Sequence, residues 1–356
     1  MPGSSEPLQS ALATALMRIW LRRGPIACVL WPVSLLFAAL AGARRALYHS
    51  GILKIVSLPV PVIVVGNLFV GGTGKTPLTI WLVDALRQAG FHPGVISRGY
   101  GSKDAGVQRV TATSSARVMG DEPVLVAQRT GCPLMVGRDR VAAGQALLAA
   151  HPEIDVILSD DGLQHYRLGR TIEIVLSDLR GDGNGWLLPA GPLRESRRRR
   201  RDFNVVNVGT LDPAQAPVLP PGTRAGSIIM QLQAPLAEQL IDRRQRTTLE
   251  AIAAAPPTAI IAAAGIGNPS RFFTTLSAAG LDFQPMPLPD HHVFTTDTFA
   301  GRAADLILIT EKDAVKCSEI TALASDARLW VVPVSAHIAA PFADNIVERL
   351  RGHATA

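Results

Sequence analysis

Cysteine and aromatic residues are scarce in this sequence. Its 356 residues include three cysteines, Cys28, Cys132 and Cys317, and only 5% are aromatic. The cysteines are odd in number, widely separated and in no metal-ligand spacing, which argues against a disulfide framework and is typical of a reducing compartment. The sequence also lacks a basic surface interleaved with aromatic residues, so nothing in it indicates nucleic-acid binding.

Charged residues are few as well, at 18%, whereas hydrophobic residues make up 47%. This composition excludes extended disorder and allows a substantial core, and the length allows two domains or one large one. Once nucleic acid is set aside, the net charge of +6 indicates another anionic partner, either a phosphorylated ligand or a membrane surface.

An apolar run of 18 residues without a charge extends from Ile26 to Ala43. As a helix it would span about 27 Å, which is marginal for crossing a bilayer, and Pro32 weakens a straight span. We expect a helix that lies in the cytoplasmic leaflet of a membrane. A crossing helix and a buried helix packed on the catalytic domain are the alternatives. The run is flanked by Arg18, Arg22, Arg23, Arg44 and Arg45.

Apolar strands alternate with helices after this run. Pro59–Val65 is a predicted buried strand, and a helix follows from Lys75 to about Gly90 with leucines along one face. Such alternation predicts an α/β fold with a doubly wound, mostly parallel sheet like that of P-loop NTPases. Further strands are expected at 93–97, 155–159 and 172–176.

A Pro-rich stretch near residues 216–223 interrupts this pattern, and a second α/β series follows it. We therefore expect a second, smaller α/β domain. The predicted divisions are a membrane-associated helical segment at 1–52, the P-loop domain at 53–208, a linker at 209–225, the second α/β domain at 226–340 and a C-terminal helix at 341–356.

Residues 71–76 form a glycine-rich loop between the first predicted strand and helix. Such a loop directs backbone N–H groups at the phosphates of a nucleoside triphosphate, while Lys75 adds a charge and the Thr76 hydroxyl is an expected Mg²⁺ ligand. Phe69 and Val70 depart from the two better-known forms of the loop, and a plain connecting turn is the alternative. The predicted nucleotide-binding residues are Gly71, Gly72, Thr73, Gly74, Lys75, Thr76 and Pro77.

A second motif, Val156-Ile-Leu-Ser-Asp160-Asp161-Gly162, is an apolar strand that ends in two carboxylates. This is the Walker-B pattern, in which a carboxylate at the carboxyl end of a strand holds Mg²⁺ directly or through water. Asp160 and Asp161 are equal candidates for that role. A strand-to-turn cap is the alternative interpretation.

Several polar clusters lie where loops are expected. They are Gly120–Pro123, Gln164-His165, Leu188–Ser196 and Asp290–His292, and five arginines follow at 197–201. Each has a plain explanation as a cap, a turn or a solvated face. The arginines could also bind phosphates or anionic lipid, because guanidinium groups suit both.

In order along the chain, these motifs resemble those of the tetraacyldisaccharide 4'-kinases of lipid A biosynthesis. The resemblance extends from about residue 15 to past 335. It is carried by VVGNLFVGGTGKTP, SRGYG at 97–101, GDEP at 120–123, DDGLQH at 160–165, LPAGPLRE at 188–195, AGIGNPSRFF at 264–273, PDHHVF at 289–294 and TEKDAVK at 310–316.

The resemblance implies a kinase that transfers the γ-phosphate of ATP to the 4'-hydroxyl of a tetraacylated glucosamine disaccharide 1-phosphate, giving lipid IVA. It implies a requirement for Mg²⁺, a lipid substrate and no required protein partner. It also implies a membrane-associated enzyme on the cytoplasmic face of the bacterial inner membrane, either peripheral or anchored through the N-terminal helix.

The same resemblance implies roles for individual residues. Lys75 and Thr76 would contact the nucleotide and metal, and Asp121 with His291 would form a catalytic dyad that activates the sugar hydroxyl. A base oriented by a carboxylate suits a hydroxyl acceptor near neutral pH. The implied metal ligands are Thr76, Asp160, Asp161 and Glu195, and near the substrate and the reacting groups would lie Gln164, His165 and Arg194.

Two other classes of protein remain as alternatives. One is a soluble P-loop ATPase or GTPase that acts as a metallochaperone or switch. GTP specificity would require [NT]-K-x-D, but in Thr310-Glu-Lys-Asp313 the lysine stands one place too late. The other is a non-catalytic membrane scaffold, which would leave the acidic and histidine clusters without a role.

Overall fold

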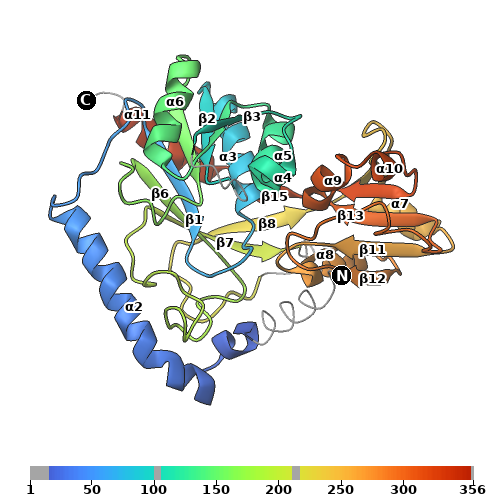
Figure 1. Ribbon diagram of the computed structural model, residues 1–356, viewed down its shortest axis with the longest axis horizontal. Coiled ribbons are helices and arrows are strands. Elements are labelled where there is room, and N and C mark those ends of the chain that lie inside the picture. The colour runs from blue at the N-terminus through green and yellow to red at the C-terminus, as the bar shows by residue number, and fades with distance from the viewer. Residues whose placement is uncertain (1–15, 100–105, 211–216, 354–356) are drawn as a thin grey trace.

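The computed structural model describes residues 16–99, 106–210 and 217–353. Parts of several predicted segments fall outside these ranges: the first 15 residues, Tyr100-Gly101 of the SRGYG motif, residues 211–216 of the linker and residues 354–356 of the last helix. Two β-sheets with their helices lie side by side, and a long N-terminal helix runs along one side (Figure 1).

The larger sheet has nine strands in the order β15-β8-β7-β6-β1-β5-β2-β4-β3. Every pairing is parallel except β3 with β4 and β15 with β8. The predicted P-loop type of doubly wound, mostly parallel sheet is thereby confirmed. The strands are β1 Val62–Asn67, β2 Pro93–Ser97, β3 Gln108–Val110, β4 Leu134–Val136, β5 Val156–Asp160, β6 Ile172–Asp178, β7 Phe203–Gly209, β8 Ile228–Gln233 and β15 Ser335–Ile338.

Helices cover both faces of this sheet. All six residues of β1 are buried, and alternate side chains enter opposite cores because successive residues of a strand point to opposite faces. Ile63 and Val65 belong to one core, Val62 and Val64 to the other. Helices α3 (Lys75–Gln88), α5 (Asp121–Thr130) and α11 (Pro341–His353) cover the first face, α6 (Arg140–Ala150) covers the second, and α4 (Ala116–Met119) precedes α5.

The smaller sheet has six strands in the order β10-β9-β14-β13-β11-β12. Its strands are β9 Leu236–Gln239, β10 Arg246–Thr248, β11 Ile260–Ala264, β12 Gln284–Pro287, β13 Leu306–Thr310 and β14 Leu329–Val332. Its helices are α7 Leu249–Ala254, α8 Pro269–Ala278, α9 Glu311–Cys317 and α10 Thr321–Ala324. The second α/β unit of the prediction is therefore present.

The sheets divide the chain differently from the predicted boundaries at 226 and 340. Strands β8 and β15 extend the larger sheet, and Phe342 and Ile346 of α11 join its core. The smaller unit thus occupies the chain between β8 and β15 and is inserted within the larger one. The order of strand and helix patterns along a sequence does not specify which sheet edge a strand joins, so this difference follows from long-range pairing.

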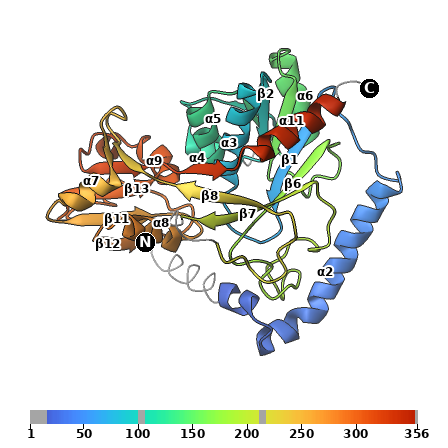
Figure 2. The same cartoon turned by 180° about the vertical axis from the view of Figure 1, so that it is seen from behind.

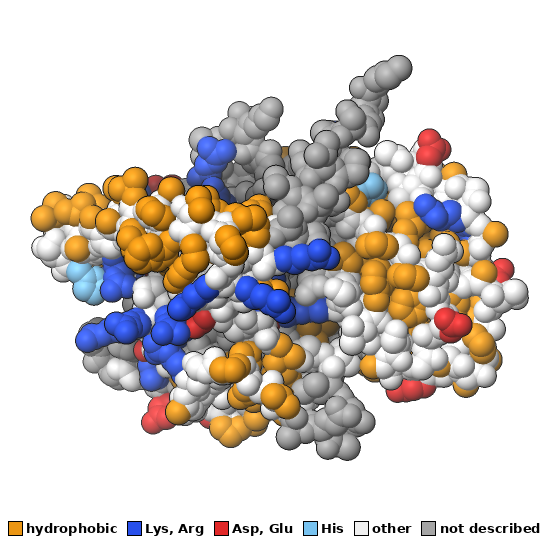
Figure 3. All heavy atoms as spheres, turned by 90° about the horizontal axis from the view of Figure 1, so that it is seen from below, with side chains coloured by type: hydrophobic (Ala, Val, Ile, Leu, Met, Phe, Trp, Pro, Cys, Tyr) orange, Lys and Arg blue, Asp and Glu red, His pale blue; other side chains and the backbone are white. Residues whose placement is uncertain are grey.

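Helix α2 (Pro25–His49) contains the predicted apolar run. It lies on the outside of the molecule, as both ribbon views show (Figures 1 and 2). Its most apolar window has a mean hydropathy of 2.2 and is only 11% buried, so the helix is long and apolar enough to cross a membrane by length and composition. That exposure disfavours the alternative of a buried core helix. Figure 3 shows the apolar surface bordered by Lys and Arg side chains.

One side of α2 is held by the loop between β6 and β7. The Ser34 hydroxyl donates to the Leu187 carbonyl at 2.9 Å and accepts from the Ala190 N–H at 2.9 Å. Trp31 and Trp186 also contact each other, with ring centroids 6.1 Å apart. The apolar helix is therefore fixed to the loop that carries the predicted site residues Arg194 and Glu195.

The arginine run has one buried member. The Arg199 guanidinium binds both carboxylate oxygens of Glu173, at 2.6 and 2.5 Å, and also contacts Glu195 and the Tyr166 hydroxyl. Burial, followed by the Glu195 charge, raises the pKa of Tyr166 to about 12. The run is thus a folded element around one buried cation, rather than a uniformly solvated charge run.

We expect Arg199→Met to lower the free energy of unfolding by about 3–5 kcal/mol, because it leaves the buried carboxylate of Glu195 without its cation and Glu173 with Arg170 alone. Arg200→Met, at an exposed position in the same run, should change it by less than about 0.5 kcal/mol. Urea unfolding of the two variants measures the difference. Equal midpoints would show that Arg199 does not stabilise the fold in this way.

Candidate active site

The glycine-rich loop joins β1 to α3 through two residues in the left-handed region, Gly71 at φ 102° and Gly74 at φ 96°. A Cβ on Gly74 would lie 2.4 Å from Asn207 Nδ2, and that amide donates to the Thr73 carbonyl at 2.8 Å. Glycine is therefore required at 74 for both conformation and space. The Thr73 hydroxyl is buried and has no hydrogen-bond partner among the described residues.

Asn67, the last residue of β1, organises the loop. Its Nδ2 donates to the carbonyls of Phe69 at 2.5 Å and Gly71 at 3.0 Å, and its Oδ1 accepts from Lys75 Nζ at 3.0 Å. The side chain thus fixes both the backbone of the loop and the position of its ammonium group. Sequence reasoning missed this residue. The available signal was a fully polar side chain at the end of an otherwise apolar strand.

Asp161 and Arg194 complete the surroundings of Lys75. Asp161 Oδ1 lies 3.6 Å from Lys75 Nζ and 3.1 Å from the Arg194 guanidinium, which also contacts Asn67. Burial alone would raise the pKa of Asp161, but the charges of Lys75 and Arg194 lower it to about 2. Asp161 is one of two non-glycine residues with positive φ, at 49°, in the described part of the chain.

Asp160 is more deeply buried than Asp161, and its negative charge is less fully paired with nearby cations. It accepts from the Thr79 hydroxyl at 3.4 Å, and the register places it beside Val65, near the end of β1. Burial, followed by the charge of Glu122, raises the pKa of Asp160 to about 6. A buried carboxylate of this kind is stabilised by a nearby cation.

The four predicted metal ligands are not all brought together. Thr76 and the aspartate pair lie around the loop, whereas the carboxylate of Glu195 is bound by Arg199. Over residues 16–99, 106–210 and 217–353, no group of three or more His, Cys, Asp and Glu side chains is placed to hold a metal. Gln164 accepts from Arg194 at 3.4 Å and so lies close by. Burial lowers the pKa of His165 to about 4.

The predicted dyad is formed by two segments far apart in sequence. Asp121 begins α5, and His291 lies in the loop after β12, with His291 Nδ1 3.4 Å from Asp121 Oδ2. His291 is the second described non-glycine residue with positive φ, at 58°. Strained backbone at both predicted positions, Asp161 and His291, is typical of functional sites. The pair lines a cavity of about 530 Å³.

Two lysines of α9 surround the acidic end of the dyad. Lys316 Nζ lies 3.3 Å from Asp121 Oδ2, and Lys312 contacts Glu122. Although burial would raise the pKa of Asp121, the hydrogen bond from His291 and the charges of Lys312 and Lys316 hold it well below its usual value. Asp121 is thus ionised at neutral pH. The hydrogen bond to it in turn raises the pKa of His291.

The smaller unit also reaches the glycine-rich loop. Arg271 of α8 binds Asp178 at 2.6 Å, and Arg180, which binds the same carboxylate, donates to the Gly72 carbonyl at 2.9 Å. A cavity of about 170 Å³ lies between Thr76 and Pro77 on one side and Ile266 and Phe272 on the other. Both units therefore contribute to one site.

Comparisons with known proteins show one family along nearly the whole chain. Residues 26–351 match the sequence profile of the family described as LpxK, tetraacyldisaccharide-1-P 4'-kinase. The tetraacyldisaccharide 4'-kinase of Herminiimonas arsenicoxydans is 57% identical over 98% of both chains, and that of Janthinobacterium sp. (strain Marseille) is 58% identical over 98% of this chain and 99% of its own. A crystal structure of LpxK from Aquifex aeolicus in complex with ATP is similar with a TM-score of 0.74 and 28% identity, over 91% of this chain and 99% of that one.

Proposed function

The chain belongs to the tetraacyldisaccharide-1-P 4'-kinase family, and on this premise we propose how its residues carry out the reaction. The protein is a kinase that transfers phosphate from ATP to the 4'-hydroxyl of a tetraacylated glucosamine disaccharide 1-phosphate, giving lipid IVA in lipid A biosynthesis. The comparisons do not support the alternative of a soluble ATPase or metallochaperone. The observation that carries the proposed mechanism is the Asp121–His291 pair, which two separate units assemble.

The proposed ATP site extends from the glycine-rich loop into the cavity between the two units. Backbone N–H groups of residues 71–76 and Lys75 would bind the phosphates, as in other loops at helix N-termini. The free space beside Gly72 and the unpartnered Thr73 hydroxyl fit a bound anion. The apolar side chains of Ile80, Ile266 and Phe272 along the cavity suit the base.

For Mg²⁺ we propose Thr76 and Asp160. A hydroxyl and a carboxylate are hard oxygen ligands of the kind that Mg²⁺ prefers, and the buried charge of Asp160 lacks a full ion pair. Asp161 is already paired with Lys75 and Arg194, and Glu195 is paired with Arg199, so neither is assigned to the metal. When bound, Mg²⁺ would neutralise negative charge on the phosphate oxygens.

We assign His291 as the base for the acceptor. Its imidazole would take the proton of the 4'-hydroxyl as that oxygen bonds to the γ-phosphorus, while the bond from the γ-phosphorus to the bridging oxygen breaks and ADP leaves. Asp121 would hold the ring in orientation and stabilise the imidazolium. Lys75, together with Arg194, would stabilise the charge that develops on the phosphoryl oxygens. Since His291 comes from the smaller unit, the two units must meet for the reaction to occur.

The exposed helix α2 supports a membrane-associated enzyme, because a lipid substrate remains in the bilayer. We propose that α2 inserts into the cytoplasmic leaflet of the inner membrane with its flanking arginines near the anionic headgroups. The exposed positions Ile26, Val29, Leu36 and Leu40 supply the apolar side.

We expect Leu36→Glu with Leu40→Glu to weaken binding to lipid vesicles roughly 100-fold, since two exposed leucines would no longer be buried in the acyl region. Vesicle sedimentation measures the loss. Val218→Glu, at a position 89% exposed outside α2, is the matched control and should bind as the wild type does. If the double variant still sediments fully, α2 is not the membrane anchor.

The experiment that tests the proposed function uses γ-labelled ATP and a tetraacyldisaccharide 1-phosphate acceptor. Label in the lipid supports the kinase, whereas label released only as inorganic phosphate supports an ATPase. If neither product forms, a non-catalytic scaffold is supported.

A further inference from the structure

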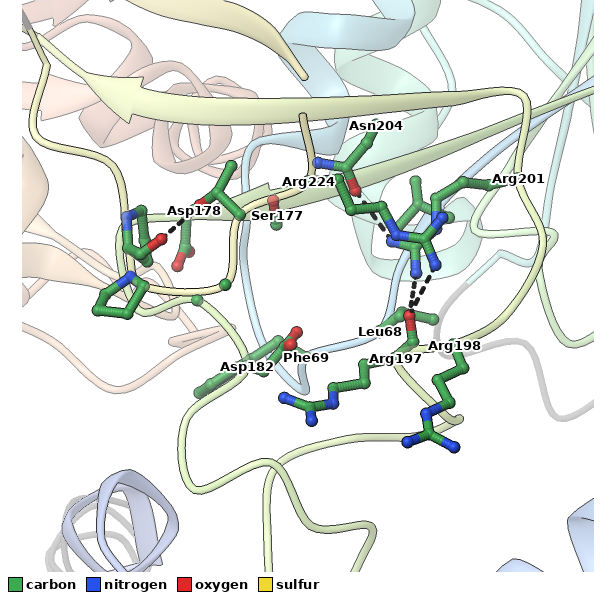
Figure 4. A pocket seen from close by; sticks show the side chains of 16 residues that line it. Leu68, Phe69, Ser177, Asp178, Asp182, Arg197, Arg198, Arg201, Asn204 and Arg224 are labelled. Carbon is green, nitrogen blue, oxygen red and sulfur yellow. Dashed lines mark hydrogen bonds between the residues drawn. The ribbon is translucent and has the colours of Figure 1, made fainter. Parts of the chain in front are cut away.

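Another cavity, of about 370 Å³, lies between the larger sheet and the loops that follow β6 and β7. Its walls include Leu68 and Phe69, the residues just before the glycine-rich loop, so it adjoins the ATP site. Figure 4 shows arginine side chains around it, from the run at 197–201 and from the loop before β8. They are Arg197, Arg198, Arg201 and Arg224.

Two of these guanidinium groups are held close to each other by the backbone. Arg201 and Arg224 both donate to the Arg197 carbonyl, at 2.5 and 3.2 Å, and Arg201 also donates to Asn204 Oδ1 at 2.9 Å. Burial, followed by the charge of Arg224, lowers the pKa of Arg201 to about 10. Two cations are thus fixed side by side, an arrangement that an anion would stabilise.

The acidic residues of the wall do not neutralise this charge. Asp178 is already bound by Arg180 and Arg271, which leaves Asp182 as the one lining carboxylate without an ion pair among the described residues. Among the residues that the structure describes, the side chains of Arg197 and Arg198 also form neither a hydrogen bond nor an ion pair. The cavity therefore carries an excess of positive charge.

The position of Arg197 and Arg198 relates the cavity to the lipid. The same two arginines line a neighbouring cavity of about 440 Å³ beneath α2, together with Ala38, Ala41 and Gly42 of the helix. They therefore lie between the apolar helix, where a lipid would be held, and the glycine-rich loop, where phosphoryl transfer would occur. A headgroup phosphate that reaches the active site from the membrane would pass these residues.

We propose that this arginine-lined cavity binds the 1-phosphate of the disaccharide substrate and so sets which end of the disaccharide faces ATP. The inference rests on the proposed function and identifies a specificity site for it. Guanidinium groups suit a phosphomonoester because their paired N–H donors match its oxygens. Arg197 and Arg198 supply free donors, while Arg201 and Arg224 supply fixed charge.

The test compares two acceptors in neutral detergent micelles, the tetraacyldisaccharide 1-phosphate and its counterpart with a 1-hydroxyl. With Arg197→Gln/Arg198→Gln, kcat/KM for the 1-phosphate acceptor should fall about 10- to 100-fold, mainly through KM, since hydrogen bonds to a charged group are lost. The 1-hydroxyl acceptor should change less than about threefold. Arg200→Gln removes the same charge at an exposed position that lines neither cavity, and it should leave both acceptors unchanged.

Three outcomes would overturn the proposal. Equal losses on both acceptors would mean that the arginines do not read the 1-phosphate, and an equal loss with Arg200→Gln would mean that only net charge matters. A defect that appears with anionic vesicles but not in neutral micelles would assign these arginines to phospholipid headgroups. If the wild type labels neither acceptor, the proposed function itself fails, and the inference fails with it.

Discussion

Lys75→Met is expected to reduce kcat/KM about 10³-fold or more, because it removes the positive charge that we propose lies next to the transferred phosphoryl group. Methionine retains an unbranched side chain of similar length, so the glycine-rich loop should keep its shape through Asn67. The loss should therefore appear mainly in kcat. Steady-state kinetics with ATP and the lipid acceptor measure it.

Two further variants sharpen this prediction. Lys75→Arg should not restore activity, because a guanidinium fork does not replace a compact ammonium beside Asn67 and Asp161. Lys54→Met removes the same charge from an exposed position between α2 and β1 and should be as active as the wild type. If Lys75→Met retained more than about a tenth of the activity, the assignment of Lys75 to the phosphates would be wrong.

His291→Ala is expected to lower kcat about 10²- to 10⁴-fold, which is the range for loss of a general base, and to leave the Kd for ATP nearly unchanged. In the proposed mechanism the dyad acts on the acceptor, whereas the glycine-rich loop would bind the nucleotide. Titration calorimetry with ATP and turnover with saturating acceptor separate the two effects. An equal loss of ATP affinity would place His291 in nucleotide binding instead.

The chain offers a matched control for that variant. His92 and Asp155 form an exposed pair with the same 3.4 Å separation as His291 and Asp121, on the larger unit. His92→Ala therefore removes a comparable histidine–aspartate contact without touching the proposed site. It should leave both kcat and the Kd for ATP unchanged.

The parts of the site that the sequence predicted are those encoded by local spacing. The loop at 71–76 and the aspartates at the end of β5 each follow a buried strand, and the carboxyl ends of parallel strands meet at one edge of a sheet. Asp121 and His291 were paired only through resemblance to a family. No local pattern specifies that a loop after β12 returns to the start of α5.

The contacts that were missed depend on tertiary packing. Asn67 is a single polar residue at the end of an apolar strand, and its two carbonyl partners become apparent only when the loop is folded. Glu195 is predicted near the metal only through the resemblance to a family, and its contact with Arg199 likewise becomes apparent only in the folded chain. The insertion of the smaller unit between β8 and β15 likewise follows from strand pairing, which composition does not encode.

The pH dependence of kcat/KM, compared between the wild type and Asp121→Asn, tests whether His291 is the base and Asp121 controls its pKa. Asp121 raises the pKa of His291 above its ordinary value, and a base must be neutral, so wild-type activity should fall as the pH decreases through that raised pKa. Without the aspartate charge, the remaining activity should be lower and its acid limb should move to lower pH. An acid limb at the same pH in both enzymes would show that His291 is not the base that Asp121 controls.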